Sequence, residues 1–320
     1  MARSSSFSNL AVPQPPAAAV PVRSFAANLL VSTRPNQWTK NLLVFAGLLF
    51  GNASIGRRLF DPPSLARAVA AFAVFCALSS TVYLINDVLD RDSDRRHPLK
   101  ASRPIASGAL GVPAALACAG LLAAAGLAAA LAISPGFAAV AGAYVALLVL
   151  YSGPLKQIVI IDVLTIAVGF VLRAVGGAVA VEVEISHWLL VCTILLALFV
   201  ALAKRRHELL LLADGAPDHR RILGEYSPYL LDQMIAVVTA STLIAYVFYT
   251  ISPETEQKFG TSWLGLTIPF PLYGIFRYLY LIHRRAEGGS PAELLITDRP
   301  LLACVALWAL LVALIIYRPL

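Results

Sequence analysis

A succession of apolar segments, separated by short polar stretches, constrains the fold of this 320-residue chain more than any other feature. Hydrophobic residues make up 59% of the sequence, and the mean hydropathy is +0.77. Charged residues make up only 13%, against about 25% in ordinary soluble domains. Apolar runs of about 20 residues are long enough to cross a bilayer as helices. We therefore expect an all-α membrane protein that resides in the lipid bilayer, and no nucleic-acid partner in spite of the net charge of +7.

The apolar runs predict nine membrane helices. Their expected bounds are 38–52, 65–88, 112–133, 136–151, 158–181, 187–203, 233–251, 263–282 and 301–317. The first 30 residues are rich in Ser, Pro and Ala and lack the pattern of a signal peptide. The predicted organisation is a disordered tail over residues 1–30, followed by one transmembrane domain over residues 31–320.

The distribution of charge between these segments predicts the orientation in the membrane. If the N-terminus is cytoplasmic, most Lys and Arg residues fall in cytoplasmic segments, including the run from Arg91 to Arg103. The opposite side keeps few cations and carries Glu182, Glu184, Glu254 and Glu256. Because cytoplasmic loops carry an excess of Lys and Arg, this bias predicts a multi-pass protein whose polar motifs lie on the cytoplasmic side.

The stretch YLINDVLDRDSDRRHPLKASRPIASG, residues 83–108, places an acidic motif at the end of an apolar run. Asn86, Asp87, Asp90 and Asp94 recur at helical spacing, so they are expected to share one helix face. Mg²⁺ prefers oxygen ligands and usually binds through one or two carboxylates plus substrate phosphates. We predict that all four residues ligate Mg²⁺ and that the three aspartates are catalytic. The alternative is a helix end that is merely solvated by its charges.

Basic residues surround this acidic motif in the sequence and recur near the ends of later apolar runs. Arg offers a planar fork to phosphate and Lys a point charge, so cations beside Mg²⁺-binding acids predict a site for a diphosphate substrate. The predicted phosphate-binding residues are Lys40, Arg95, Lys100, Arg103, Tyr151, Lys156, Asp162, Arg173 and Lys204. Orientation in the membrane is an alternative explanation for several of these cations. For Asp162 and Arg173 the alternative is a structural ion pair within the bundle.

These motifs resemble the UbiA superfamily of intramembrane prenyltransferases. The family motif NDxxDxxxD is matched in full by Asn86, Asp87, Asp90 and Asp94. The resemblance implies a UbiA-like bundle of nine transmembrane helices around a cytoplasmic-side cavity, with Mg²⁺ as the cofactor. A second family motif, DxxxD, is incomplete here, because the residue four after Asp162 is an isoleucine. This departure puts aromatic prenylation in doubt.

The segments RPNQWTKN, NDVLDRDSDRRHPLKASRPIASG, YSGPLKQ and LAKRRHELLLL resemble the decaprenyl-phosphate phosphoribosyltransferase branch of this superfamily. That resemblance implies a bacterial inner-membrane enzyme whose substrates are phosphoribosyl pyrophosphate and a polyprenyl phosphate. The product would be a precursor of lipid-linked arabinose donors, used for envelope arabinan or for an exported glycolipid such as a nodulation factor. The alternatives are transfer of a prenyl diphosphate to an aromatic acceptor and, in another class, a transporter or lipid flippase. The sequence leaves a homo-oligomer open.

Overall fold

The computed structural model describes residues 24–97, 100–184, 187–212, 221–284, 294 and 297–317, and its regular elements in these ranges are all helices. Six of the described helices are long and apolar enough to cross a membrane. They are α3 (Pro62–Leu89), α6 (Val112–Ile133), α7 (Pro135–Ser152), α8 (Ile161–Ala180), α11 (Pro228–Ile251) and α15 (Arg299–Ile316). The prediction of a multi-pass, all-α membrane protein is thereby confirmed.

The other three predicted spans differ from simple membrane helices. The span expected at 38–52 is built from a 3₁₀ segment η1 (Pro35–Phe45), a π-helical segment η2 (Gly47–Gly51) and a short α2 (Asn52–Ser54). Helix α9 (His187–Leu212) begins where expected and continues past residue 203. The span expected at 263–282 is divided into η6 (Trp263–Thr267) and α13 (Pro269–Arg284), because a proline suits the first turn of a new helix. The count of nine membrane helices therefore stays a prediction.

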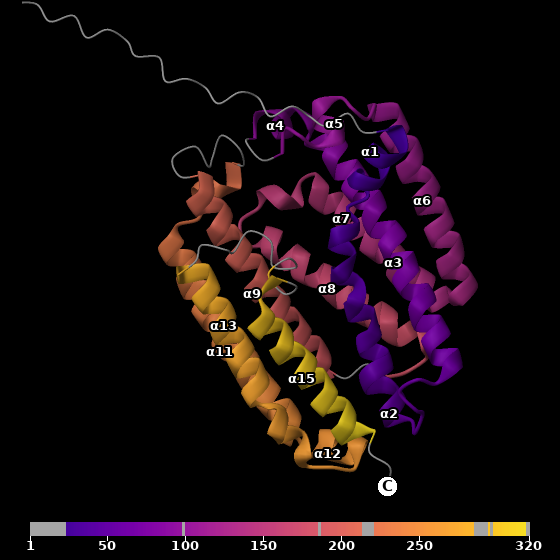
Figure 1. The fold of residues 1–320 in the computed structure, drawn as a ribbon, viewed down its shortest axis with the longest axis vertical. Coiled ribbons are helices and arrows are strands. Elements are labelled where there is room, and N and C mark those ends of the chain that lie inside the picture. Colours follow the sequence, from indigo (N-terminus) through magenta and orange to yellow (C-terminus); the bar gives the residue numbers. More distant parts are fainter. Residues whose placement is uncertain are drawn as a thin grey trace, which may run out of the picture.

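Short helices cover the two ends of the bundle. Helices α1 (Phe25–Ser32), α4 (Arg91–Arg96) and α5 (Pro104–Ser107) lie at one end, and α2 and α12 (Pro253–Phe259) lie at the other (Figure 1). Helix α1 begins within the segment expected to be a disordered tail and ends just after it, at Ser32. The Ser24 side chain caps this helix by accepting a hydrogen bond from the Ala27 amide. The tail predicted to end at residue 30 therefore gives way to a helix earlier, and residues 1–23 lie outside the described part.

Two groups of helices pack on either side of α8 (Figure 1). Phe75 of α3 and Phe137 of α7 meet edge to face in one hydrophobic cluster, to which α8 contributes Ala180. The other cluster joins α9, α11, α13 and α15 and takes Val163 from the opposite end of α8. Helix α8 is therefore the shared element that fixes the two groups relative to each other.

Glycines allow the irregular η1–η2 segment to approach α8 at backbone contact. A Cβ atom at Gly177 would overlap the carbonyl group of Val44, and one at Gly47 would lie 2.7 Å from the backbone nitrogen of Ala178. Side chains at either position would push the two segments apart. The close approach matters for the site, because it brings η1 against the face of α8 that carries Arg173.

We expect the Gly177→Ala variant to be less stable than wild type by about 2 kcal/mol, since its methyl group must displace backbone. Gly142 of α7 provides the matched control, because an added Cβ there meets nothing within 4 Å. Gly142→Ala should stabilise the helix by about 0.5–1 kcal/mol. Thermal unfolding of the purified variants in detergent would measure both changes, and equal unfolding temperatures for the two would contradict the tight contact.

Candidate active site

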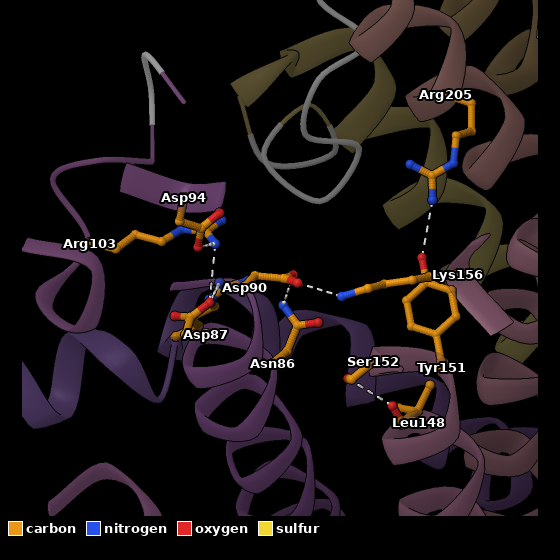
Figure 2. A network of polar contacts seen from close by, with 11 residues as sticks. Asn86, Asp87, Asp90, Asp94, Arg103, Leu148, Tyr151, Ser152, Lys156 and Arg205 are labelled. Atoms are coloured by element: carbon orange, nitrogen blue, oxygen red, sulfur yellow. Dashed lines mark hydrogen bonds and ion pairs between the residues drawn. The ribbon is translucent and has the colours of Figure 1, made fainter. Parts of the chain in front are cut away.

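The acidic motif spans a break between two helices. Helix α3 ends at Leu89, Asp90 adopts φ −90° and ψ 6°, and α4 begins at Arg91. The single helical face predicted for the motif is therefore wrong in this detail, because the chain turns at Asp90. Asp87 and Asp94 are buried, whereas the Asp90 side chain is 31% exposed. The turn nevertheless keeps all three carboxylates at one end of the bundle (Figure 2).

One guanidinium group joins the two buried carboxylates. Arg103 Nη1 lies 3.1 Å from Asp87 Oδ1 and 2.6 Å from Asp94 Oδ2, as Figure 2 shows. Arg34, which precedes η1, forms a second ion pair with Asp87. Two carboxylates and two guanidinium groups thus neutralise one another where the N-terminal segment, α3 and α5 meet.

The third carboxylate turns toward a different part of the bundle. Lys156 Nζ lies 2.5 Å from Asp90 Oδ1, and the Asn86 side-chain amide donates a 3.0 Å hydrogen bond to Asp90 Oδ2 (Figure 2). Lys156 belongs to η3 (Leu155–Gln157), in the turn between α7 and α8. That turn therefore carries a predicted phosphate-binding cation directly to the acidic motif.

The donor chemistry of these residues fits Mg²⁺. Within the described ranges, no three His, Cys, Asp or Glu side chains form a group that could hold a metal as they stand. Asp87 and Asp94 nevertheless share a single cationic nitrogen of Arg103, so their oxygens already converge on one positive charge. Since Mg²⁺ usually needs only one or two carboxylates beside substrate phosphates, this pair supplies enough ligands. The metal site stays a prediction that the geometry supports.

Asp162 is fully buried, and both of its carboxylate oxygens accept hydrogen bonds from other side chains. Arg205 Nε donates to Asp162 Oδ2 at 2.6 Å, and the Tyr226 hydroxyl donates to Asp162 Oδ1 at 2.8 Å. The alternative of an Asp162–Arg173 ion pair is wrong, because eleven residues along a helix correspond to about 16 Å along its axis. Both oxygens of Asp162 are engaged with Arg205 and Tyr226 and neither is exposed. Contact of Asp162 with phosphate therefore stays a prediction.

The buried network of Asp162, Arg205 and Tyr226 also forms hydrogen bonds at both ends of the turn that carries Lys156. Arg205 Nη2 donates to the Tyr151 hydroxyl at 3.1 Å, at the end of α7 (Figure 2). The Tyr226 hydroxyl accepts a 2.8 Å hydrogen bond from the Ile160 amide, just before α8. Ile160 has φ +68°, a conformation that β-branched residues rarely adopt. The buried network thus holds this turn in a conformation that its own sequence disfavours.

The remaining predicted phosphate-binding residues have different surroundings. Arg95 is exposed and donates from Nε to the Ala106 carbonyl at 2.8 Å, which turns it away from the acidic motif. Lys204 forms an ion pair with Glu208, one helical turn further along α9, at 3.8 Å. Lys100 is half-buried in the turn that precedes α5, and Lys40 is half-buried in η1.

A pocket of about 250 Å³ opens beside the buried acids. Its wall includes Arg34, Arg103 and Asp87, together with polar side chains of α1 and the residues around α5. Those polar residues are Asn28, Ser32, Ser102 and Ser107. Val31, Pro104 and Ala109 complete the wall, so groups that could hydrogen-bond a phosphorylated ligand lie beside apolar ones.

Residues 44–294 match the UbiA prenyltransferase family. The chain belongs to this family. It is 31% identical over 300 residues to decaprenyl-phosphate phosphoribosyltransferase of Corynebacterium glutamicum, a match covering 93% of this chain and 89% of the relative. It is 33% identical over 297 residues to the protein of that name from Mycolicibacterium smegmatis, covering 90% of this chain and 92% of the relative. These matches confirm the resemblance drawn from the motifs.

A solved structure shows the same fold. The UbiA homolog from Archaeoglobus fulgidus bound to GPP and Mg²⁺ superposes with a TM-score of 0.70 and covers 90% of this chain and 99% of its own. At 22% sequence identity this likeness establishes the UbiA-like architecture. It also shows that a protein of this fold binds Mg²⁺.

Three residues of this UbiA-family site were not among the predicted ones: Arg34, Arg205 and Tyr226. Arg34 opens the RPNQWTKN segment, where Trp38 and Lys40 are the more obvious features. Arg205 follows Lys204 directly in the sequence. Which of the two contacts Asp162 depends on which face of α9 packs against α8, and the sequence does not give that face. Tyr226 carries no local signal, because its partners Asp162 and Ile160 lie more than 60 positions away.

The buried hydrogen bonds of Tyr226 predict a stability change at high pH. Burial raises the pKa of Tyr226 from its ordinary value of 10.0 to about 12, so folding favours the neutral phenol. The resulting stabilisation is fully present below pH 10 and is lost as the pH rises through 12. Tyr226→Phe should lower the free energy of unfolding at pH 8 by about 1–3 kcal/mol, because Asp162 loses a donor. Melting temperatures from pH 8 to 12 would test this, and a wild type–variant difference that stays constant over this range would contradict it.

Proposed function

We propose that this UbiA-family protein transfers the 5-phosphoribosyl group of phosphoribosyl pyrophosphate to a polyprenyl phosphate such as decaprenyl phosphate. The observation that carries the proposal is the similarity to decaprenyl-phosphate phosphoribosyltransferases over nine-tenths of the chain. The geometry supports it, because the site has one acidic motif and the second family acid is replaced by Ile166. Asp162, the remaining acid of that second motif, is held by Arg205 and is not open to a second metal ion.

The acidic motif and its cations would bind the diphosphate of the donor. Asp87 and Asp94, with Asp90 and Asn86, would hold Mg²⁺, which supplies neutralisation of charge on the leaving group when bound. Arg34, Arg103 and Lys156 already lie beside these acids and would donate hydrogen bonds to phosphate oxygens. The pocket beside Asp87 would take the sugar side of the donor.

The transfer reaction depends on alignment of the two substrates more than on proton transfer. An oxygen of the lipid phosphate attacks C1 of the ribose, and the bond from C1 to the diphosphate oxygen breaks. The electron pair leaves with pyrophosphate, and the anomeric carbon is inverted. The attacking phosphate is ionised at neutral pH, so the site needs no strong general base. Its cations act by holding both anions in line and by stabilising the charge that develops on the leaving group.

The proposal also places the protein in the cell. We infer a bacterial inner-membrane protein with a cytoplasmic N-terminus and a single transferase domain over residues 31–320. The end of the bundle with α1, α4 and α5 carries five cations, namely Arg34, Arg91, Arg95, Lys100 and Arg103. This cluster supports the orientation, because positive residues favour the cytoplasmic side. The apolar surfaces of the helices would accommodate the prenyl chain.

Membranes that contain the expressed chain provide the test. We would supply Mg²⁺, radiolabelled phosphoribosyl pyrophosphate and decaprenyl phosphate, and measure label in the organic phase. Label that disappears with EDTA and in the Asp90→Ala variant is the expected result. No label, together with turnover of a prenyl diphosphate and an aromatic acid, would overturn the proposal in favour of aromatic prenylation. Inactivity in both assays would leave transport as the function to test next.

A further inference from the structure

Arg173 carries a buried positive charge whose hydrogen-bond partners are all neutral groups. It lies in the middle of α8 and is 5% exposed. Its guanidinium donates to Asn41 Oδ1 at 2.7 Å, to the Tyr144 hydroxyl at 2.7 Å and to the Gly169 carbonyl at 2.9 Å. It also lies over the rings of Tyr144 and Phe170, 4.8 and 5.0 Å from their centroids. Its hydrogen bonds are satisfied, but none of these partners carries a negative charge.

A second cation adds to this charge. Lys40 lies close enough to Arg173 to interact with it electrostatically, and it does the same with Arg34 and Lys204. Within the described part of the chain, the Lys40 ammonium forms no ion pair and no hydrogen bond. Charged groups inside a membrane bundle are costly, and like charges side by side raise the cost further. An arrangement of this kind is favourable when an anion lies between the two cations.

These cations are separate from those that neutralise the acidic motif. The Asn41 amide donates to Ser79 Oγ of α3 at 3.3 Å, which fixes the level of η1 along that helix. Ser79 precedes Asp87 by eight residues, which corresponds to about 12 Å along an α-helix. Asn41 and Arg173 therefore lie deeper in the bundle than Asp87, whose own partners are Arg34 and Arg103. Lys40 lies within electrostatic range of both Arg173 and Arg34, and so connects the two levels.

We propose that Lys40 and Arg173 form a second anion site, which binds a phosphate monoester deeper in the bundle than the diphosphate of the donor. This inference rests on the proposed function and divides the predicted phosphate-binding residues into two sets. The lipid phosphate is the ligand that the surroundings favour, because the cations lie among aromatic rings and membrane helices where a prenyl chain can continue. The 5-phosphate of the donor has the same chemistry, so the experiment must separate the two sources.

Lys40→Met is the informative variant, because Lys40 has no described partner whose loss would unfold the protein. We would measure binding of decaprenyl phosphate and of decaprenol, which lacks the phosphate, to the purified full-length chain in detergent. Wild type should prefer decaprenyl phosphate, and Lys40→Met should lose about tenfold or more of that preference, as expected for a charge-assisted hydrogen bond. Lys40→Arg should keep it. Lys258→Met, a half-buried lysine of α12 at the other end of the bundle, is the control that should change nothing.

Donor binding separates the two sources of the monoester. We would compare phosphoribosyl pyrophosphate with inorganic pyrophosphate, both with Mg²⁺, in the same variants. Loss of the lipid phosphate preference alone assigns the site to the acceptor. If the variant loses only the preference for phosphoribosyl pyrophosphate over pyrophosphate, the site binds the 5-phosphate of the donor. That result would support a monoester site, with the donor and not the lipid as its ligand. If Lys40→Met changes neither preference, the inference is overturned. Because binding is measured without turnover, a failure of the proposed transfer reaction would appear separately, as absence of label transfer by wild type.

Discussion

Replacing Asp87 with Asn should reduce transfer activity by at least about 100-fold, while membrane insertion and folding are retained. Asp87 is buried, receives ion pairs from Arg34 and Arg103, and shares the latter with Asp94. Asparagine keeps the size of the side chain but removes the charge that would hold Mg²⁺ and orient both guanidinium groups. The Mg²⁺ concentration for half-maximal rate should rise in the variant, and it should be measured beside the maximal rate.

Asp92 provides a control from the same stretch of chain. Its side chain is 89% exposed, and it lies outside the predicted metal set. Asp92→Asn removes the same charge only a few residues away and should leave the rate within about twofold of wild type, since an exposed charge is weakly coupled to the site. If Asp87→Asn retained the wild-type rate and its sensitivity to EDTA, the metal assignment would be wrong.

Local sequence predicted the regular part of the fold well. Helix α6 has the bounds that were expected, 112–133, because Gly111 and Pro113 mark its start and Ser134 marks its end. The first span could not be predicted in this way. Its 3₁₀ and π geometry accompanies close backbone contacts of Gly47 and Gly177 with neighbouring segments. Residues 38–52 by themselves do not predict those contacts.

The candidate site likewise contains residues that local sequence predicted and residues that it did not. The four residues of its acidic motif fall within nine consecutive positions, 86–94, so helical spacing and membrane energetics were enough to propose them. Their partners are brought together by the tertiary fold, with Arg34 and Asp87 separated by 53 positions and Lys156 and Asp90 by 66. Spacing within one helix also suggested the wrong partner for Asp162. Proximity along a helix face does not extend to residues about 16 Å apart along the axis.

Arg205→Ala should have the largest effect on stability of any single change in the site. It leaves the carboxylate of Asp162 fully buried without its cation, which costs about 3–5 kcal/mol. It also removes a hydrogen bond donor to Tyr151 and an ion pair with Glu208, so the turn that carries Lys156 loses an anchor. Activity should therefore fall even at temperatures where the variant remains folded. Thermal unfolding and transfer rate, measured on the same detergent preparation, would test both expectations.

Arg206→Ala is the matched control for this prediction. Arg206 follows Arg205 on α9 and pairs at 2.6 Å with Asp232, whose side chain is 36% exposed, so its loss should cost only about 1 kcal/mol. The double variant Asp162→Asn, Arg205→Gln removes both buried charges and should recover much of the stability lost in Arg205→Ala, because the cost comes from the unpaired charge. Its activity should stay low if the network acts by holding the Lys156 turn. Equal stabilities for Arg205→Ala and Arg206→Ala would mean that Asp162 does not depend on Arg205.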